Sequence, residues 1–355
     1  MQQKSVSKKA LLCGYYGRDN VGDDALLMSL LQMMPQEIQP LVLSATPQQT
    51  KEKLQVPAVP HRSAFSILEA LQQADCFIWG GGSLMQDVTS FRNPIYYGGL
   101  MALAQQRGLK TLAWAQGVGP LHLPFSRWLT RKALWGCDAI TVRDRASAEL
   151  LGQWGLSPLL APDPVWALES EPLPKLWELP APRIAVTLRR HKQLTRNKLQ
   201  AITNALISFQ KATETCILLV PFQPQDYSLA EEIAKQLPDP KAIIQDESPT
   251  RLKTLFQGVE MAIGMRYHSL IMAAGEECNC FAISYDPKIS QLMTEFEMPG
   301  WEVSEIPEDS NAISKAWLDQ YANGQGLTPD QIQSQRDRAL MHKEILSRVL
   351  RRLPT

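Results

Sequence analysis

Short apolar runs alternate with helical patterns along the first half of the chain. Runs of about five apolar residues that end in Gly, Ser or a charged residue are typical of strands buried on both faces. The runs are ALLCG (10–14), LVLS (41–44), CFIWG (76–80), TLAWAQG (111–117) and AITVR (139–143). Apolar residues at helical spacing fill residues 24–34, 93–108, 126–136 and 145–155. This alternation predicts a parallel, doubly wound sheet.

A second series of the same kind follows a proline-rich segment. Its apolar runs are IAVTLR (184–189), TCILLVPF (215–222), KAIIQ (241–245), EMAIGM (260–265) and CFAISYD (280–286), with helical patterns at 194–212 and 268–277. The prolines exclude a regular helix or strand from the segment between the two series. We therefore expect two Rossmann-like α/β domains in a GT-B-like arrangement, with a long helix at the C-terminus. The expected parts are an N-terminal domain (1–168), a linker (169–183), a C-terminal domain (184–325) and the final helix (326–355).

Composition narrows the class of protein. A chain of 355 residues suits two domains, and 45% apolar residues are ordinary for a globular protein. The 36 basic residues equal the 36 acidic residues, so charge does not suggest nucleic acid as a partner. We expect a cytoplasmic protein, because the apolar run after the first basic residues is too short for a signal peptide and no run reaches a membrane span. Only Cys278 and Cys280 lie close together, so no metal site is expected.

Glycine-rich and polar motifs follow the predicted strands of the first domain. They are GYYGRDNVGDDA (14–25), WGGGSLMQD (79–87), AQGVGP (115–120) and VRDRAS (142–147). Ligands of open parallel sheets bind at the carboxyl ends of the strands, where these motifs lie. None of them fits GxGxxG or GxxxxGK[ST], which disfavours a nicotinamide dinucleotide and a Walker-type nucleotide site.

The first of these motifs is unusually acidic for a turn that precedes a helix. Asp19, Asp23 and Asp24 occupy the place where a phosphate cradle would leave backbone N–H groups open to an anion. Two interpretations stay open for Asp23. It caps a helix that begins near Asp24, or, like Asp19, it accepts a proton from a hydroxyl-rich ligand such as a sugar.

Cationic residues gather at the predicted strand ends of the second domain. In GMRYHSLIMAA (264–274), Arg266 and His268 are two residues apart at a strand-to-helix turn and are expected on one side of the chain. Arg189 and Arg190 follow another strand, and Lys288 follows the last one. Each alone is a surface charge, but together they predict an electropositive pocket for a small, highly charged anion. In the first domain Arg143 ends a strand and is a further candidate for the cleft.

In combination these motifs resemble those of the polysaccharide pyruvyl transferase family, most closely its CsaB-type bacterial and cyanobacterial members. The resemblance extends from about Leu11 to about Lys288, with the motifs in the family's order. It implies a GT-B-like fold and transfer of a pyruvyl group from phosphoenolpyruvate to two hydroxyls of a cell-wall or exopolysaccharide sugar, with release of phosphate. For CsaB-type members the implied acceptor is a β-linked N-acetylmannosamine.

The resemblance implies phosphoenolpyruvate as co-substrate and no cofactor, and by motif position it implies roles for Arg266, His268, Lys288 and Arg143. The remaining assignments are our own hypothesis from the pattern of residues. Phosphoenolpyruvate is expected at Arg266, Lys288, Arg189, Arg190 and Arg143, with His268 as acid and Asp19 or Asp23 as base. The expected acceptor residues are Tyr16, Asn20, Gly81, Gly82, Ser83 and Gln116. The enzymatic alternative is a GT-B glycosyltransferase that uses a nucleotide sugar. The non-enzymatic alternative is a sugar- or peptide-binding regulator.

The C-terminal helix is predicted to be basic and amphipathic. Its cations include Arg336, Lys343 and Arg348, and its apolar residues include Leu346 and Leu350. Such a helix packs its apolar face on its own protein, which we favour, or lies on an anionic membrane that carries lipid-linked acceptors. We therefore expect a cytoplasmic location with a peripheral contact to the inner face of the plasma membrane as a compatible addition.

Overall fold

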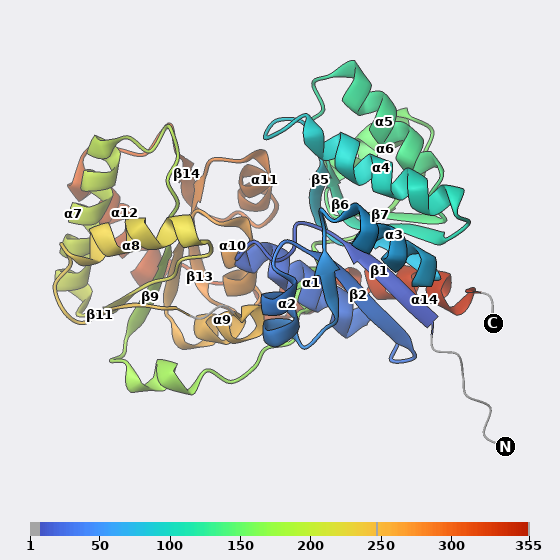
Figure 1. Cartoon of the computed structure of the whole chain (residues 1–355). Coiled ribbons are helices and arrows are strands. Elements are labelled where there is room, and N and C mark those ends of the chain that lie inside the picture. The colour runs from blue at the N-terminus through green and yellow to red at the C-terminus, as the bar shows by residue number, and fades with distance from the viewer. Residues whose placement is uncertain (1–7, 246–247, 354–355) are drawn as a thin grey trace. The chain divides into compact units, whose positions relative to one another are not determined.

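The computed structural model describes residues 8–245 and 248–353, and the chain divides into two compact units (Figure 1). Unit 1 comprises Met1–Arg18, Asp23–Leu168 and Ser334–Thr355. Unit 2 comprises Asp19–Gly22 and Glu169–Gln333. The change from unit 1 to unit 2 after Leu168 falls where the proline-rich segment begins, and the chain returns to unit 1 at its C-terminal end.

Unit 1 is built on a parallel sheet with the strand order β3-β2-β1-β4-β6-β7-β8, and β5 pairs with β6. The predicted apolar runs form its central strands, because residues such as Leu12, Ile78 and Ala113 are buried completely. The strands are β1 (Lys8–Cys13), β2 (Ile38–Ser44), β3 (Ala58–Pro60), β4 (Cys76–Trp79), β5 (Gly82–Met85), β6 (Lys110–Val118), β7 (Ala139–Val142) and β8 (Leu159–Leu160). From β1 the chain adds β2 and β3 on one side of the sheet and then β4, β6, β7 and β8 on the other side. The carboxyl ends of β1 and β4 therefore flank the topological switch point of the sheet.

Helices cover both faces of this sheet, each with its own apolar cluster. One cluster joins the sheet to α3, α4, α5 and α6, which lie together in Figure 1. The other joins it to α1, α2 and α14. The helices are α1 (Val21–Met33), α2 (Pro47–Leu54), α3 (Ala64–Gln73), α4 (Arg92–Gln106), α5 (Pro124–Trp135), α6 (Arg145–Gln153) and α14 (Met341–Arg351).

Unit 2 repeats the architecture with a parallel sheet in the order β11-β10-β9-β12-β13-β14. Its strands are β9 (Arg183–Thr187), β10 (Cys216–Leu219), β11 (Lys241–Ile243), β12 (Met261–Gly264), β13 (Asn279–Ser284) and β14 (Gly300–Glu302). Its helices are α7 (Arg196–Thr213), α8 (Pro224–Ala234), α9 (Pro249–Leu255), α10 (Tyr267–Ala274), α11 (Pro287–Glu295) and α12 (Ser310–Asn323). The chain passes from unit 2 to unit 1 within α13 (Pro329–Ala339). One apolar cluster packs α7, α8 and α12 on the sheet, and α10 and α11 contact β12 and β13. The prediction of two parallel α/β sheets is confirmed.

Two local expectations need correction. The proline-rich segment contains a short 3-10 helix, η2 (Pro174–Glu178), after η1 (Pro164–Ala167), because proline is compatible with the first turn of such a helix. The C-terminal helix is interrupted at Leu340, which separates α13 from α14. Within residues 8–245 and 248–353, no helix combines the length and apolar character needed to cross a membrane.

The apolar face of α14 packs on unit 1, as the favoured interpretation of the C-terminal helix requires. Leu346 and Leu350 belong to the cluster beneath the sheet. His342 is buried and bonds through Nε2 to the Pro162 carbonyl oxygen and through Nδ1 to the Thr141 hydroxyl, both at 2.9 Å. The Pro162 carbonyl oxygen can only accept, so Nε2 of the neutral His342 ring carries the proton, and Nδ1 accepts from the Thr141 hydroxyl, whose oxygen also accepts from the Ala115 amide at 2.7 Å.

Candidate functional site

Tyr16 lies at the switch point of the unit 1 sheet with its ring against glycines. The ring is buried, and a Cβ added at Gly14 or Gly80 would overlap it. Burial, with the nearby Cys13 and Asp23, raises the pKa of Tyr16 well above its usual value, so the hydroxyl stays protonated. The hydroxyl has no hydrogen-bond partner among the described residues. A buried hydroxyl in that condition is a candidate for binding a polar ligand.

Gln116 of β6 lies beside the same glycine-rich turn. Its Nε2 donates to the carbonyl oxygens of Gly80 at 2.7 Å and Trp114 at 3.0 Å, which fixes the direction of the amide. Its Oε1 is buried and has no partner within the described part of the chain. Gly82 has φ +117°, and a Cβ there would lie 3.5 Å from Asp23 Oδ1. Tyr16, Gln116 and Asp23 therefore surround the turn formed by residues 80–82.

Arg143, predicted to meet the anion, makes contacts within unit 1. Its Nη1 is 2.6 Å from Asp163 Oδ2, and the two side chains are only 5% and 0% exposed. Its Nη2 donates to Ser83 Oγ at 3.3 Å. The carboxylate of Asp163 also accepts from the Val165 amide at 3.0 Å. Arg143 thus holds Ser83 beside the glycine turn, and its ion pair with Asp163 is a structural anchor.

The start of α1 differs from the expectation that Asp23 caps a helix near Asp24. The helix begins at Val21, and the side chain of Asn20 accepts a hydrogen bond from the Gly22 amide at 3.1 Å. Asn20 is therefore the capping residue, and Asp23 and Asp24 lie in the first turn, where carboxylates stabilise the helix dipole. Asp19 precedes the cap with φ +52°, a conformation that Asp tolerates better than most residues.

Residues 19–22 are grouped with unit 2, where Gly22 lies against His268. A Cβ at Gly22 would overlap the His268 ring at Nδ1, so only glycine leaves this ring in place. The Val21 amide donates to the Phe222 carbonyl oxygen at 3.0 Å. His268 lies in the first turn of α10, and its ring meets that of Tyr267 edge to face at 5.4 Å.

Arg266, at the end of β12, is held by a carboxylate and an amide. Its Nε donates to Asp226 Oδ2 at 2.9 Å, and its Nη2 donates to Asp226 Oδ1 at 2.5 Å and to Gln223 Oε1 at 2.9 Å. The guanidinium and the carboxylate are almost fully buried, at 10% and 2% exposed. Arg266 is thus fixed in direction by Gln223 and Asp226, two residues that follow β10.

The other predicted cations of unit 2 have different surroundings. Arg189 lies with its guanidinium 4.5 Å from the centre of the Tyr285 ring, and its Nη1 donates to the Tyr285 hydroxyl at 2.8 Å. Arg190 forms an exposed ion pair with Glu232 at 2.7 Å. Lys288 lies in the first turn of α11, where its amide donates to Asp286 Oδ1 at 3.0 Å. Because β9, β12 and β13 are neighbours, Arg189, Arg266 and Lys288 follow adjacent strands of one sheet edge.

The model of the polysaccharide pyruvyl transferase family matches residues 20–287 of this chain. The chain belongs to the polysaccharide pyruvyl transferase family. No curated protein sequence is significantly similar to it.

Solved structures resemble this polysaccharide pyruvyl transferase family member in fold. The UDP-GlcNAc 2-epimerase of Methanocaldococcus jannaschii superposes with a TM-score of 0.65 at 10% identity, covering 96% of this chain and 99% of its own. A putative UDP-N-acetylglucosamine 2-epimerase from Listeria monocytogenes has a TM-score of 0.63 at 12% identity, covering 97% and 95%. MurG of Acinetobacter baumannii has a TM-score of 0.52 at 10% identity, covering 97% and 99%. These likenesses confirm the predicted GT-B-like fold.

The structure gathers the candidate residues of this family member at the edges of two sheets. In unit 1 it places Tyr16, Gln116 and Asp23 around the glycine turn that contains Gly81 and Gly82, and Arg143 beside Ser83. In unit 2 it places His268, Arg266, Arg189 and Lys288 at neighbouring strand ends, whereas Arg190 pairs with a surface carboxylate.

Sequence reasoning missed the residues that hold these candidates in place. Asp226 and Gln223 fix Arg266, Asp163 fixes Arg143, and Tyr285 supports Arg189. One signal was available in the sequence: polar residues directly after TCILLVPF occupy a predicted strand end. The ion pair itself could not be predicted, because Asp226 and Arg266 are 40 residues apart in the sequence.

Proposed function

We propose that this protein transfers a pyruvyl group from phosphoenolpyruvate to two hydroxyls of a polysaccharide or lipid-linked sugar, with release of phosphate. The observation that carries the proposal is the family assignment over residues 20–287. We further propose a CsaB-type specificity, with β-linked N-acetylmannosamine of a cell-wall polymer as acceptor. The reaction then takes place in the cytoplasm, with phosphoenolpyruvate as co-substrate and no cofactor.

The cationic edge of unit 2 suits phosphoenolpyruvate, which carries a phosphate and a carboxylate. Arg266 offers Nη1 from a guanidinium already fixed by Asp226 and Gln223, so little side-chain entropy is lost on binding. Arg189 is fixed by Tyr285, and its buried Nε has no partner among the described residues. Two fixed forks and the ammonium of Lys288 supply the donors that two anionic groups require.

The proposed reaction is a stepwise ketal formation. His268 delivers a proton to the methylene carbon of phosphoenolpyruvate, which makes the adjacent carbon electrophilic. One acceptor hydroxyl adds to that carbon, its proton passes to Asp19 or Asp23, and the carbon–oxygen bond to phosphate breaks. The departing phosphate takes up the proton held by that carboxylate. The second hydroxyl then adds to the same carbon and passes its proton to His268, which restores the acid and closes the ketal.

The glycine edge of unit 1 suits a neutral sugar better than an anion. Tyr16 provides a buried hydroxyl and Gln116 a buried amide oxygen, and neither atom has a partner in the described residues. A hydroxyl-rich ligand satisfies both atoms, since a sugar hydroxyl donates and accepts hydrogen bonds. Gly81 and Gly82 are buried against Leu26 and Asp23, and the partly exposed Ser83 and Asn20 are the proposed polar neighbours of the sugar.

The test is acceptor-dependent phosphate release from phosphoenolpyruvate, with the product identified by mass spectrometry as the pyruvate ketal. Synthetic β-N-acetylmannosaminyl and lipid-linked acceptors are compared with β-N-acetylglucosaminyl ones. His268→Asn is expected to lower kcat by about 100-fold or more, the usual contribution of a general acid. Gly22→Ala is expected to do the same by displacing the His268 ring.

Three results would contradict the proposal. Phosphate release that does not depend on an acceptor removes the transferase claim. Turnover of a UDP-sugar in the absence of phosphoenolpyruvate supports the alternative, a nucleotide-sugar enzyme such as those that share the fold. Retention of function in His268→Asn would point to a sugar-binding regulator.

A further inference from the structure

An exposed aromatic and aliphatic surface lies where α4 and α5 begin. It consists of Phe91, Ile95, Leu123, Phe125 and Trp128, which we call the α5 patch, and between 46% and 56% of each residue is exposed. The rings of Phe125 and Trp128 stack at 5.9 Å. Exposed apolar residues that occur singly are normal, but a contiguous group marks an interaction site.

The two helix starts are held side by side. Asp87, just before α4, accepts hydrogen bonds from the amides of His122 and Leu123, just before α5, both at 2.8 Å. Further along, a Cβ at Gly98 of α4 would lie 3.0 Å from Leu129 of α5, so the two helices pack closely. The patch therefore lies on two helices of unit 1 that pack against each other, α4 and α5 (Figure 1).

Cations surround the patch, and carboxylates are absent from its sequence. No acidic residue occurs between Asp87 and Asp138, a segment that contains Arg92, Arg107, Lys110, Arg127, Arg131 and Lys132. Several of these cations lie near the exposed rings. Lys132 Nζ is 5.3 Å from the centre of the Trp128 ring, and the Arg92 guanidinium is 5.9 Å from that of Phe91. Lys110 pairs with Asp138, away from the patch.

This combination fits one kind of partner. Tryptophan and phenylalanine with adjacent arginine and lysine are typical of surfaces that lie in the interface of an anionic bilayer. A second copy of the chain fits less well, because a two-fold dimer through this surface places the same cations opposite one another. We propose that the α5 patch binds an anionic lipid bilayer, with Phe125 and Trp128 entering the interface and the surrounding cations meeting phosphate headgroups.

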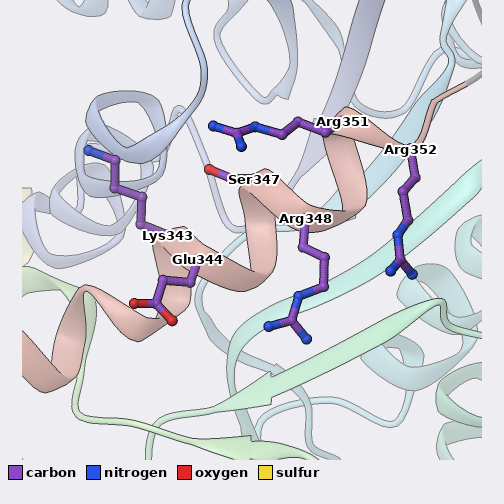
Figure 2. Close-up of a pocket in the computed structure, with 6 residues that line it drawn as sticks. All are labelled: Lys343, Glu344, Ser347, Arg348, Arg351 and Arg352. Atoms are coloured by element: carbon purple, nitrogen blue, oxygen red, sulfur yellow. The ribbon is translucent and has the colours of Figure 1, made fainter.

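The basic helix α14 does not offer the same combination. Figure 2 shows Lys343, Arg348, Arg351 and Arg352 projecting from α14 around a surface hollow of about 570 Å³. Its apolar residues are used in the core of unit 1. The helix therefore supplies charge but no apolar side chains for insertion. The α5 patch takes the membrane contact that the sequence left open as the second interpretation of the C-terminal helix, and it does so independently of the proposed transferase activity.

Flotation of the full chain with lipid vesicles tests the inference. We expect the protein to float with vesicles of equal parts phosphatidylcholine and phosphatidylglycerol, and not with phosphatidylcholine alone. The double variant Phe125→Ser/Trp128→Ser is expected to lower the bound fraction about tenfold, because two rings leave the interface. Trp177→Ser in unit 2, where the ring is 61% exposed, is the matched control and keeps the binding.

A pair of charge reversals separates the α5 patch from α14. Arg127→Glu/Arg131→Glu is expected to abolish flotation, whereas Arg348→Glu/Arg352→Glu keeps most of it. Far-UV circular dichroism of each variant establishes that it is folded. The inference is overturned if the wild type floats with neither vesicle, or if only the α14 reversal abolishes flotation. It is also overturned if the serine variant changes the oligomeric state and leaves flotation unchanged.

Discussion

The two sheet edges that carry the candidate residues contain different chemical groups. The edge of unit 1 presents neutral polar atoms, the Tyr16 hydroxyl and the Gln116 amide oxygen, buried among glycines. The edge of unit 2 presents cations that are already clamped, Arg266 by Asp226 and Arg189 by Tyr285. Under the proposed function, the edge of unit 1 meets a neutral sugar and the edge of unit 2 meets an anion.

The two edges also differ in how far their candidate residues contribute to the stability of the fold. In unit 2 a buried ion pair fixes the site directly, so the site and the fold depend on the same two residues. In unit 1 the buried pair of Arg143 and Asp163 lies behind the site, and Tyr16 makes no hydrogen bond that the fold requires. Substitutions should therefore separate function from stability in unit 1 more easily than in unit 2.

The largest effect is expected from Asp226→Ala. This change leaves the Arg266 guanidinium buried without its carboxylate, and breaking a buried pair costs about 3–5 kcal/mol of the free energy of unfolding. Urea denaturation followed by circular dichroism measures the loss. The matched control is Asp239→Ala, whose carboxylate pairs with Lys241 at 87% exposure and should cost less than about 0.5 kcal/mol. Equal losses in the two variants would show that Arg266 does not depend on Asp226.

The next effect is a pH dependence confined to unit 1. Burial lowers the pKa of His342 from 6.5 to about 4, while the nearby Pro162 carbonyl and Asp163 oppose the shift. Below pH 6.5 the unfolded chain binds a proton that the folded chain resists, so stability falls as the pH drops from about 6.5 to about 4. The full shift corresponds to a loss of about 3 kcal/mol.

Urea denaturation at a series of pH values checks this expectation. His342→Gln should be less stable at pH 7 but should lose less stability between pH 7 and pH 4 than the wild type. Parallel pH profiles for the two proteins would mean that another group is responsible.

The sequence predicted the central strands because they are buried on both faces and read as unbroken apolar runs. It did not predict β3, β5, β8 and β14, which are two to four residues long and leave no periodic signal. It placed the candidate residues at strand ends, because strand order in a parallel sheet brings those ends to one edge. It offered Asp23 as the cap where the structure has Asn20, since both residue types are suitable.

A smaller effect is expected from Tyr16→Phe. The hydroxyl is buried without a partner in the described residues, so its removal should leave the free energy of unfolding unchanged or raise it by about 1 kcal/mol. If the hydroxyl binds the acceptor, the KM for the acceptor should rise about tenfold, the equivalent of one lost hydrogen bond. Steady-state kinetics and urea denaturation of the same preparation measure both quantities.

The control for that variant is Tyr96→Phe in the same unit. Tyr96 donates to the His61 carbonyl oxygen at 2.6 Å, so its removal should lower the free energy of unfolding by about 1 kcal/mol. A stability loss for Tyr16→Phe as large as that for Tyr96→Phe would place the Tyr16 hydroxyl in the fold and not in the site.

The smallest effect is expected at Arg190, and it sharpens the account of the cationic edge. Arg190 and Glu232 are 56% and 44% exposed, so Arg190→Ala should change the free energy of unfolding by less than about 0.5 kcal/mol. Its neighbour Arg189 is held against Tyr285, and Arg189→Met should raise the KM for phosphoenolpyruvate, whereas Arg190→Ala should not. The opposite result would mean that the exposed guanidinium of Arg190 binds the anion. The contact of Arg189 with Tyr285 would then not be what makes a cation of this edge a binding residue.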